Sequence, residues 1–103
     1  MLHDPAVAGF VASLTQPAPP AGASPALRGV WHALRGEWDA AHDAVQPDAP
    51  ECAWVHAALH REEGDMENAG YWYRLARQAV ACGPHRDEYL AIAQVLLARS
   101  DDG

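Results

Sequence analysis

The sequence predicts an all-α fold of about five to six helices, paired as antiparallel helical hairpins. The first observation is a passage that occurs twice, 28 residues apart, as Gly36-Glu37-Trp38-Asp39-Ala40-Ala41 and Gly64-Asp65-Met66-Glu67-Asn68-Ala69. A repeat of this period is typical of stacked helical hairpins. The second observation is that apolar residues recur at helical spacing, and no segment alternates as a strand does. The short turns between the predicted helices favour antiparallel neighbours.

Residues 1–15 contain the first predicted helix. Asp4 is a typical N-cap, and Pro5 suits the first helical position, where a missing N–H costs nothing. An apolar stripe follows at helical spacing, formed by Val7, Phe10, Val11 and Leu14. Residues 16–24 are a linker rich in Pro and Ala, which stiffens the connection. The N-terminal helix is therefore able to pack on the domain, swing free or cross to another subunit.

Residues 25–103 are predicted to form a domain that resembles a helical repeat. Ser24 and Pro25 repeat the cap-and-proline signal and begin the second helix, which Gly36 ends. The third helix starts near Trp38 and is stopped by the prolines that follow it. The remaining helices are a fourth from about Pro50 to Glu63, a fifth from Asp65 that carries its apolar stripe to Val80 before Gly83-Pro84, and a sixth from about Arg86 to Arg99.

Composition and charge narrow the class of protein. A chain of 103 residues forms one small domain, and its net charge of −7 argues against a nucleic-acid partner. Cys52 and Cys82 make no CxxC motif and are too few for a disulfide scaffold, so a reducing compartment suits them. No apolar run is long enough to span a membrane, and no basic stretch precedes an apolar core, so we expect a cytoplasmic protein.

Two segments, Trp38 to Val45 and Met66 to Ala76, resemble the second helices of tetratricopeptide repeats. In that family an apolar residue after Gly-Asp packs under the turn, a small Ala lets the helices approach closely, and an aromatic residue follows four residues later. These positions hold Met66, Ala69 and Tyr73. The resemblance implies stacked helical pairs, and such repeats bind many unrelated partners.

The resemblance extends over roughly residues 25 to 80. Gly29 matches the small residue of the family's first helix, although the period is 28 residues instead of about 34. The first helices lack the family's full set of Trp, Leu, Gly and Tyr. The stretch from Trp54 to Tyr73 is also similar to one found in small bacterial proteins of unassigned function, which implies no activity.

Candidate metal ligands lie on the fourth predicted helix. Cys52, His56, His60 and Glu63 project within about 80° of one another. His56 and His60, one turn apart, are able to share a zinc or other divalent ion directly. A third ligand would have to come from another helix, and His42 and His32 are the candidates. The general-base Glu of HExxH is absent.

The alternative interpretation is that His56 and His60 are core residues. They lie within an apolar arc of the fourth helix, and buried imidazoles need hydrogen-bond partners. Such partners are available in Asn68, Tyr71, Tyr73 or a carboxylate.

The opposite face of the fourth helix brings Trp54 and Arg61 close in angle. In a helical repeat this side of a first helix lines the concave surface, and an aromatic ring beside a guanidinium suits a peptide or carboxylate ligand. The alternative is that another helix, such as the N-terminal one, covers Trp54.

The fifth and sixth predicted helices carry more apolar surface than one buried face needs. The fifth is apolar nearly all round, which predicts a place in the middle of the bundle between the fourth and sixth helices. Tyr71, Trp72 and Tyr73 would then lie mostly in the core. The sixth helix lacks a clean polar face, which suggests self-association as a homodimer.

These observations favour a small interaction module without catalysis, which binds a protein or peptide as a homodimer. The second hypothesis is a metal- or small-ligand-binding protein with a His cluster between the third, fourth and fifth helices, and the metal ligands would be His42, His56 and His60. An enzyme using these histidines as acid–base groups is the third, without a nameable substrate. The predicted binding residues are Trp54, His56, His60, Arg61, Asn68, Tyr71 and Trp72.

Overall fold

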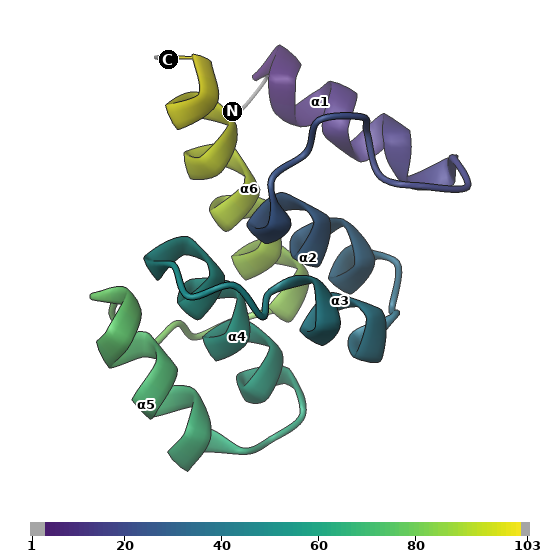
Figure 1. Ribbon diagram of the computed structural model, residues 1–103. Coiled ribbons are helices and arrows are strands. Elements are labelled where there is room, and N and C mark those ends of the chain that lie inside the picture. The colour runs from purple at the N-terminus through teal and green to yellow at the C-terminus, as the bar shows by residue number, and fades with distance from the viewer. Residues whose placement is uncertain (1–3, 102–103) are drawn as a thin grey trace.

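The computed structural model describes residues 4–101, and within that range it contains helices and no strand (Figure 1). The elements are α1 (Pro5–Ala12), a 3-10 turn η1 (Ser13–Thr15), α2 (Pro25–Leu34), α3 (Trp38–Ala44), α4 (Pro50–Glu62), α5 (Met66–Ala76) and α6 (His85–Asp101). This confirms the predicted all-α class with about six helices. The outermost residues of the predicted N- and C-terminal segments, 1–3 and 102–103, lie outside the described residues.

The duplicated passage forms the turns of two hairpins, α2–α3 and α4–α5 (Figure 1). Gly36 and Gly64 both adopt a left-handed conformation, with φ of 78° and 90°. In both turns the N–H of the residue after the glycine donates to a carbonyl five residues earlier, at 2.9 Å. This is a Schellman motif, which favours glycine because a Cβ would strain the backbone. The repeat in the sequence is therefore a repeated way of ending one helix and beginning the next.

Small residues let the helices of the first hairpin pack closely. A Cβ on Gly29 of α2 would lie 2.4 Å from Cγ1 of Val45, which follows α3. Ala41 and Ala69, equivalent in the two copies of the passage, are both fully buried. Met66 differs from the expectation that it packs under the turn, since its side chain is 49% exposed.

The central helix of the molecule is α4, which packs against α2, α3, α5 and α6. The prediction that the fifth helix lies in the middle of the bundle is wrong, because α5 packs mainly on α4 and forms an edge of the molecule (Figure 1). Among its aromatic residues only Tyr73 is buried, while Trp72 is half-buried and Tyr71 is 50% exposed. One face of α5 carries its buried residues, and the apolar residues opposite remain at the surface.

The fifth helix also ends earlier than its apolar stripe predicts. Arg77 adopts a left-handed conformation, with φ 60° and ψ 42°, and stops α5 at Ala76. The N–H of Gln78 then donates to the carbonyl oxygen of Tyr73 at 3.0 Å, as in a glycine-terminated helix. Val80 therefore lies in the segment before α6 and is 55% exposed. No Gly or Pro marks this turn, so the sequence signal is weak.

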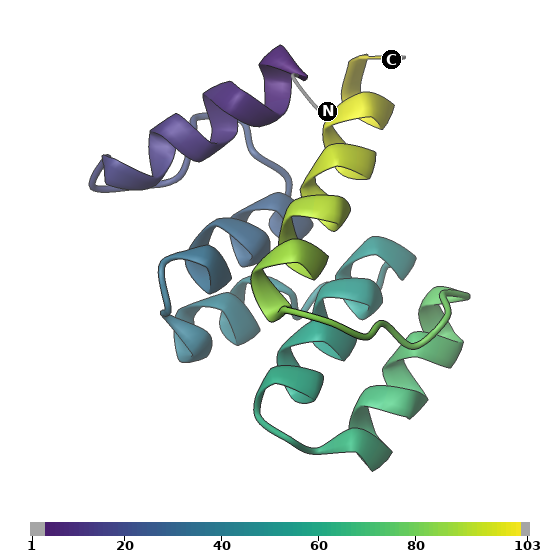
Figure 2. The ribbon, with the colours of Figure 1, turned by 180° about the vertical axis from the view of Figure 1, so that it is seen from behind.

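Helix α6 crosses α2 and α4 and reaches α1 at its other end (Figure 2). It contributes Tyr89, Ile92, Ala93 and Leu96 to the main core, which also holds Phe10 of α1 and Trp31 of α2. Ile92 is fully buried. The broad apolar surface of α6 is thus largely used by packing within the chain.

The N-terminal helix packs on the rest of the molecule, one of the three arrangements that the linker allows. The indole N–H of Trp31 donates to Oγ of Ser13 at 3.1 Å. The Arg35 guanidinium donates to the carbonyl oxygens of Leu14 and Gln16 at 2.7 and 3.0 Å. These bonds fix the end of the helix and the start of the linker. No helix in the described part of the chain has the length and apolar character needed to cross a membrane.

Candidate metal centre

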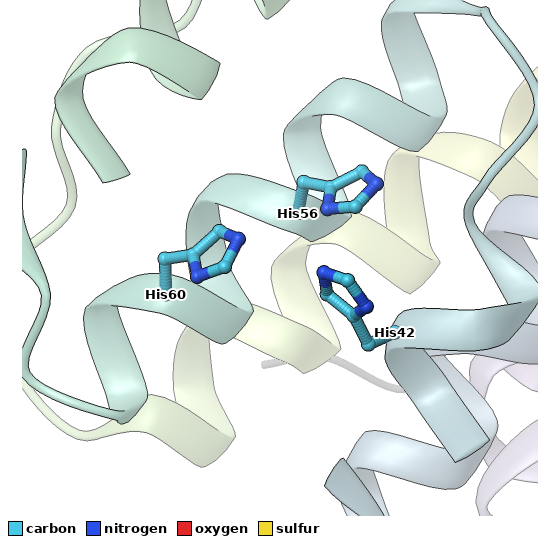
Figure 3. A group of neighbouring side chains, drawn as sticks. All are labelled: His42, His56 and His60. Atoms are coloured by element: carbon cyan, nitrogen blue, oxygen red, sulfur yellow. The ribbon is translucent and has the colours of Figure 1, made fainter. Parts of the chain in front are cut away.

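Three histidines from two helices meet on one side of α4 (Figure 3). His42 lies in the last turn of α3, and His56 and His60 lie one turn apart in α4. One ligand nitrogen from each ring lies within 4.8 Å of the other two. Of the two residues proposed as a third ligand, His42 joins the pair, whereas Nδ1 of His32 lies 2.8 Å from Oε1 of Glu37 in the first hairpin.

Trp38 positions α3 so that His42 lies over the histidine pair. Its indole N–H donates to the carbonyl oxygen of Leu59 in α4 at 2.9 Å. One turn later along α3, the ring of His42 stacks on Trp38 with centroids 4.9 Å apart. The same short helix therefore provides both the contact that holds it on α4 and the third imidazole.

Aromatic rings enclose the cluster from both sides. Trp72 of α5 stacks on His56 with centroids 4.1 Å apart, and Trp38 meets the ring of His60 edge-on at 5.8 Å. His56 and His60 are 5% and 7% exposed, while His42 is half-buried. The cluster is therefore largely shielded from water, with His42 at its more accessible edge.

Two of the rings have a neighbour for their outer nitrogen. Nδ1 of His60 lies 3.1 Å from Oε1 of Glu63, and Nδ1 of His42 lies 3.4 Å from Nε2 of Gln46. The Glu63 carboxylate accepts from Nδ1 of His60, which orients that ring and leaves its Nε2 unprotonated, as commonly seen behind metal-binding histidines. The Gln46 amide nitrogen instead donates to Nδ1 of His42, so the neutral His42 ring carries its proton on Nε2. Nε2 of His60 is thus ready to bind an ion, whereas Nε2 of His42 becomes a ligand only in the tautomer that carries the proton on Nδ1.

His56 is the ring whose environment is least satisfied. Among the residues that the structure describes, its Nδ1 is the buried side-chain nitrogen or oxygen that lacks a hydrogen-bond partner. Burial, together with the neighbouring His42 and His60, lowers the pKa of His56 from 6.5 to about 4. The ring is therefore neutral at pH 7, and an unprotonated Nδ1 offers its lone pair to the cluster.

The arrangement is close to that of a metal centre. In Figure 3 a nitrogen of each ring faces the space between the three residues. Tetrahedral zinc with bonds of about 2.0–2.1 Å holds its nitrogens about 3.3 Å apart. The three nitrogens lie within 4.8 Å of one another, so the side chains would have to move to bring them to this separation.

The residues of the opposite face of α4 have a different environment. The Arg61 guanidinium donates to Oε1 of Glu88 at 3.0 Å and to the carbonyl oxygen of Gly83 at 2.5 Å. Its side chain is only 9% exposed. Trp54 is half-buried. It packs against the main core and against a smaller cluster formed by Ala57, Ala69 and Tyr73. The chain itself, through α6 and the segment before it, occupies the side on which Trp54 and Arg61 were predicted to line a concave surface.

The three remaining predicted binding residues lie on α5 and differ in their contact with the histidines. Trp72 reaches the histidines through its stack on His56. Asn68 is half-buried in the first turn of α5, and the rings of Tyr71 and Trp72 form a T-shaped pair with centroids 5.3 Å apart. The converging ligand atoms around His56 come from His42, His56 and His60.

Sequence reasoning missed Trp38 and Gln46, which support the cluster, and it placed Glu63 among the candidate ligands instead of as a partner of His60. Trp38 contacts the rings of His42 and His60, and Gln46 contacts His42. The signal was present, because Trp38 precedes His42 by four residues, Gln46 follows it by four, and Glu63 follows His60 by three. These are the spacings at which side chains on one helix face meet.

A cavity of about 350 Å³ lies beside the cluster, between the loop that joins α3 to α4 and helix α5. His56 and Trp72 form part of its wall, together with Val45, Asp48 and Leu75. His56 is therefore the member of the cluster that lines this cavity.

Comparison with protein-family models, curated proteins and solved structures finds no match to this chain. Its function is therefore argued from the geometry of the cluster.

Proposed function

We propose that this protein binds a divalent transition-metal ion, with zinc as the first choice, through His42, His56 and His60. The observation that supports this most is the buried Nδ1 of His56, which has no hydrogen-bond partner and lies in a group of three imidazoles. A buried polar atom without a partner destabilises the fold by about 1–3 kcal/mol. A metal ion bound to Nδ1 of His56 would remove this cost.

The expected donor atoms follow from the hydrogen bonds of each ring. Glu63 accepts from Nδ1 of His60, which leaves Nε2 of that ring as the donor atom. His42 would bind through Nε2 as well, in the tautomer that places its proton on Nδ1 and gives up the hydrogen bond from Gln46. His56 contributes Nδ1, because that atom is buried and unpartnered. Three neutral imidazoles suit zinc, copper or nickel and not calcium or magnesium, which prefer oxygen ligands.

The metal would also fasten α3 to α4, because His42 comes from the first helix and the other two ligands from the second. The helix α3 has only seven residues and packs against α4. Binding to the folded state alone stabilises that state in proportion to the logarithm of the free metal concentration. We therefore expect zinc to raise the melting temperature of the metal-free protein.

The experiment is a zinc titration of chelator-treated protein by calorimetry, with circular dichroism to show that each variant is folded. We expect one ion per chain. His42→Asn, at the more accessible edge of the cluster, should weaken zinc binding at least about tenfold, since second-sphere changes alone cost 10- to 100-fold. His32→Asn is the matched control and should bind as the wild type does. Absence of zinc binding, or an equal loss in the His32→Asn control, would overturn the proposal.

A protein or peptide interaction is the second candidate function, and the outer face of α5 favours it. Tyr71 and Leu75, one turn apart, are 50% and 49% exposed. Adjacent exposed apolar side chains are a common feature of interaction surfaces. A homodimer through this face should dissociate in a Tyr71→Ser/Leu75→Gln variant, as measured by sedimentation over a range of protein concentrations. A wild-type protein that stays monomeric throughout would exclude the homodimer.

A further inference from the structure

We infer that the metal ion held by His42, His56 and His60 keeps one coordination position for a water molecule or a small monodentate anion. This inference rests on the proposed function and adds the class of ligand that the centre takes. It makes the site an exchangeable centre, whereas structural zinc sites are closed by four protein ligands.

The first argument is the number of donors. Within the part of the chain that the structure describes, the group around His56 contains no fourth His, Cys, Asp or Glu. Glu63 and Asp65 form a different group with His60, and both are exposed. Glu63 lies at Nδ1 of His60, the nitrogen on the far side from the shared space. Three protein nitrogens are the set found in catalytic zinc sites, in which the fourth ligand is exchangeable.

The second argument is charge. Neutral imidazoles leave the full charge of a divalent ion uncompensated, and this ion would lie between rings that Trp38 and Trp72 shield from water. A cation in such an environment favours an anionic ligand, because burying an unpaired charge is costly. Water bound to the ion would satisfy this need by releasing a proton to solvent and becoming hydroxide. Zinc lowers the pKa of bound water to about 7, so this would occur near neutral pH. An inorganic anion satisfies it by replacing the water, with no change in oxidation state.

The third argument is access and size. His42 and Trp38 are half-buried, so the shell around the centre is open at their edge. The stack of Trp72 on His56 closes the other side. The three ligand nitrogens lie within 4.8 Å of one another, so an ion between them is crowded by three rings and favours a narrow linear anion over a branched carboxylate. Azide is therefore a suitable probe.

Cobalt in place of zinc makes the coordination visible, because four-coordinate cobalt absorbs visible light and its spectrum depends on each ligand. The experiment adds cobalt to the metal-free full-length protein and titrates the product with azide. We expect a saturable change in the visible spectrum. His32→Asn should respond as the wild type does, and His42→Asn should lose the cobalt spectrum.

The outcomes separate this inference from the proposed function. Cobalt binding without any spectral response to azide would overturn the exchangeable position and leave the three-histidine metal site intact. A protein that takes up neither cobalt nor zinc would overturn both. A response that is the same in His42→Asn would assign the metal to another place in the chain and would also overturn the inference.

Discussion

At the scale of single residues, the burial of His56 opposes the protonation of its ring. Its pKa of about 4 in the folded protein lies below the ordinary value of 6.5, mainly because burial disfavours the imidazolium. The unfolded chain therefore binds a proton between these two pH values that the folded chain does not bind. Stability rises with pH wherever the unfolded state binds more protons. The stability that depends on a neutral His56 is therefore complete above pH 6.5 and is lost as the pH falls toward 4.

We therefore predict that His56→Phe makes the metal-free protein less sensitive to acid. Phenylalanine keeps an aromatic ring against Trp72 and removes the group that must stay neutral. The loss attributable to His56 between pH 6.5 and 4 is on the order of 3 kcal/mol, at about 1.4 kcal/mol for each pKa unit. Urea denaturation at pH 7.5 and pH 4 measures it. Equal loss of stability on acidification in wild type and variant would contradict the pKa assigned to His56.

Part of the histidine cluster was predictable from the sequence, and the environment of Arg61 was not. His56 and His60 were predictable as a pair because they lie one turn apart on one helix. His42 was one of two candidates, and only the position of α3 on α4 decides between them. The environment of Arg61 was not predictable, because its partner Glu88 lies 27 residues away and no local pattern connects them.

At the scale of helices, the close packing of α2 on the α3–α4 connection depends on the missing side chain of Gly29. We predict that Gly29→Ala destabilises the protein by about 1–3 kcal/mol, the usual cost of overfilling a packed core. A methyl group there would lie 2.4 Å from Cγ1 of Val45 and 3.2 Å from Cγ1 of Val55. Alanine normally stabilises a helix by about 1 kcal/mol relative to glycine, so the crowding must exceed this gain. Urea denaturation measures the difference.

Gly9→Ala in α1 is the matched control, because a Cβ at Gly9 meets nothing within 4 Å. This variant should be more stable than the wild type by about 0.5–1 kcal/mol. A partial rescue of Gly29→Ala by Val45→Ala would identify the contact responsible. If both glycine variants gained stability, the close approach at Gly29 would not exist.

Helix boundaries were predictable where chemistry marks them. Ser24-Pro25, Gly36 and Gly64 delimit the hairpins as expected, because a cap, a ring-fixed φ and a left-handed turn each need a particular residue. The end of α5 was not predictable, since Arg77 takes the left-handed conformation without the glycine that usually signals it. The place of α5 at the edge was also missed, because apolar content alone does not show which helix has the most neighbours.

At the scale of the whole molecule, α4 has two polar faces with separate roles. One face holds the histidines against α3 and Trp72 of α5. The other carries Arg61, which α6 engages through Glu88, while the Tyr73 hydroxyl of α5 donates to the same carboxylate. Burial and this hydrogen bond raise the pKa of Tyr73. The network thus joins α4, α5 and the first turns of α6.

We predict that Glu88→Gln destabilises the protein by about 3–5 kcal/mol, because it leaves the guanidinium of Arg61 without its opposite charge in a buried place. The two side chains of this pair are 9% and 6% exposed. Glu37→Gln is the matched control: its pair with Arg35 has side chains 28% and 38% exposed, so this variant should lose much less stability than Glu88→Gln. Urea denaturation of both variants gives the comparison.

The two faces of α4 also allow a test of their independence. Glu88 lies on α6, which packs on α1, α2 and α4, whereas the histidines face α3 and α5. Under conditions where Glu88→Gln is still folded, its zinc affinity should equal that of the wild type, even though its free energy of unfolding is lower. A parallel loss of stability and zinc affinity would mean that the attachment of α6 also sets the geometry of the three histidines. In that case α4 would transmit a change from one face to the other, and the helical core would be part of the metal centre.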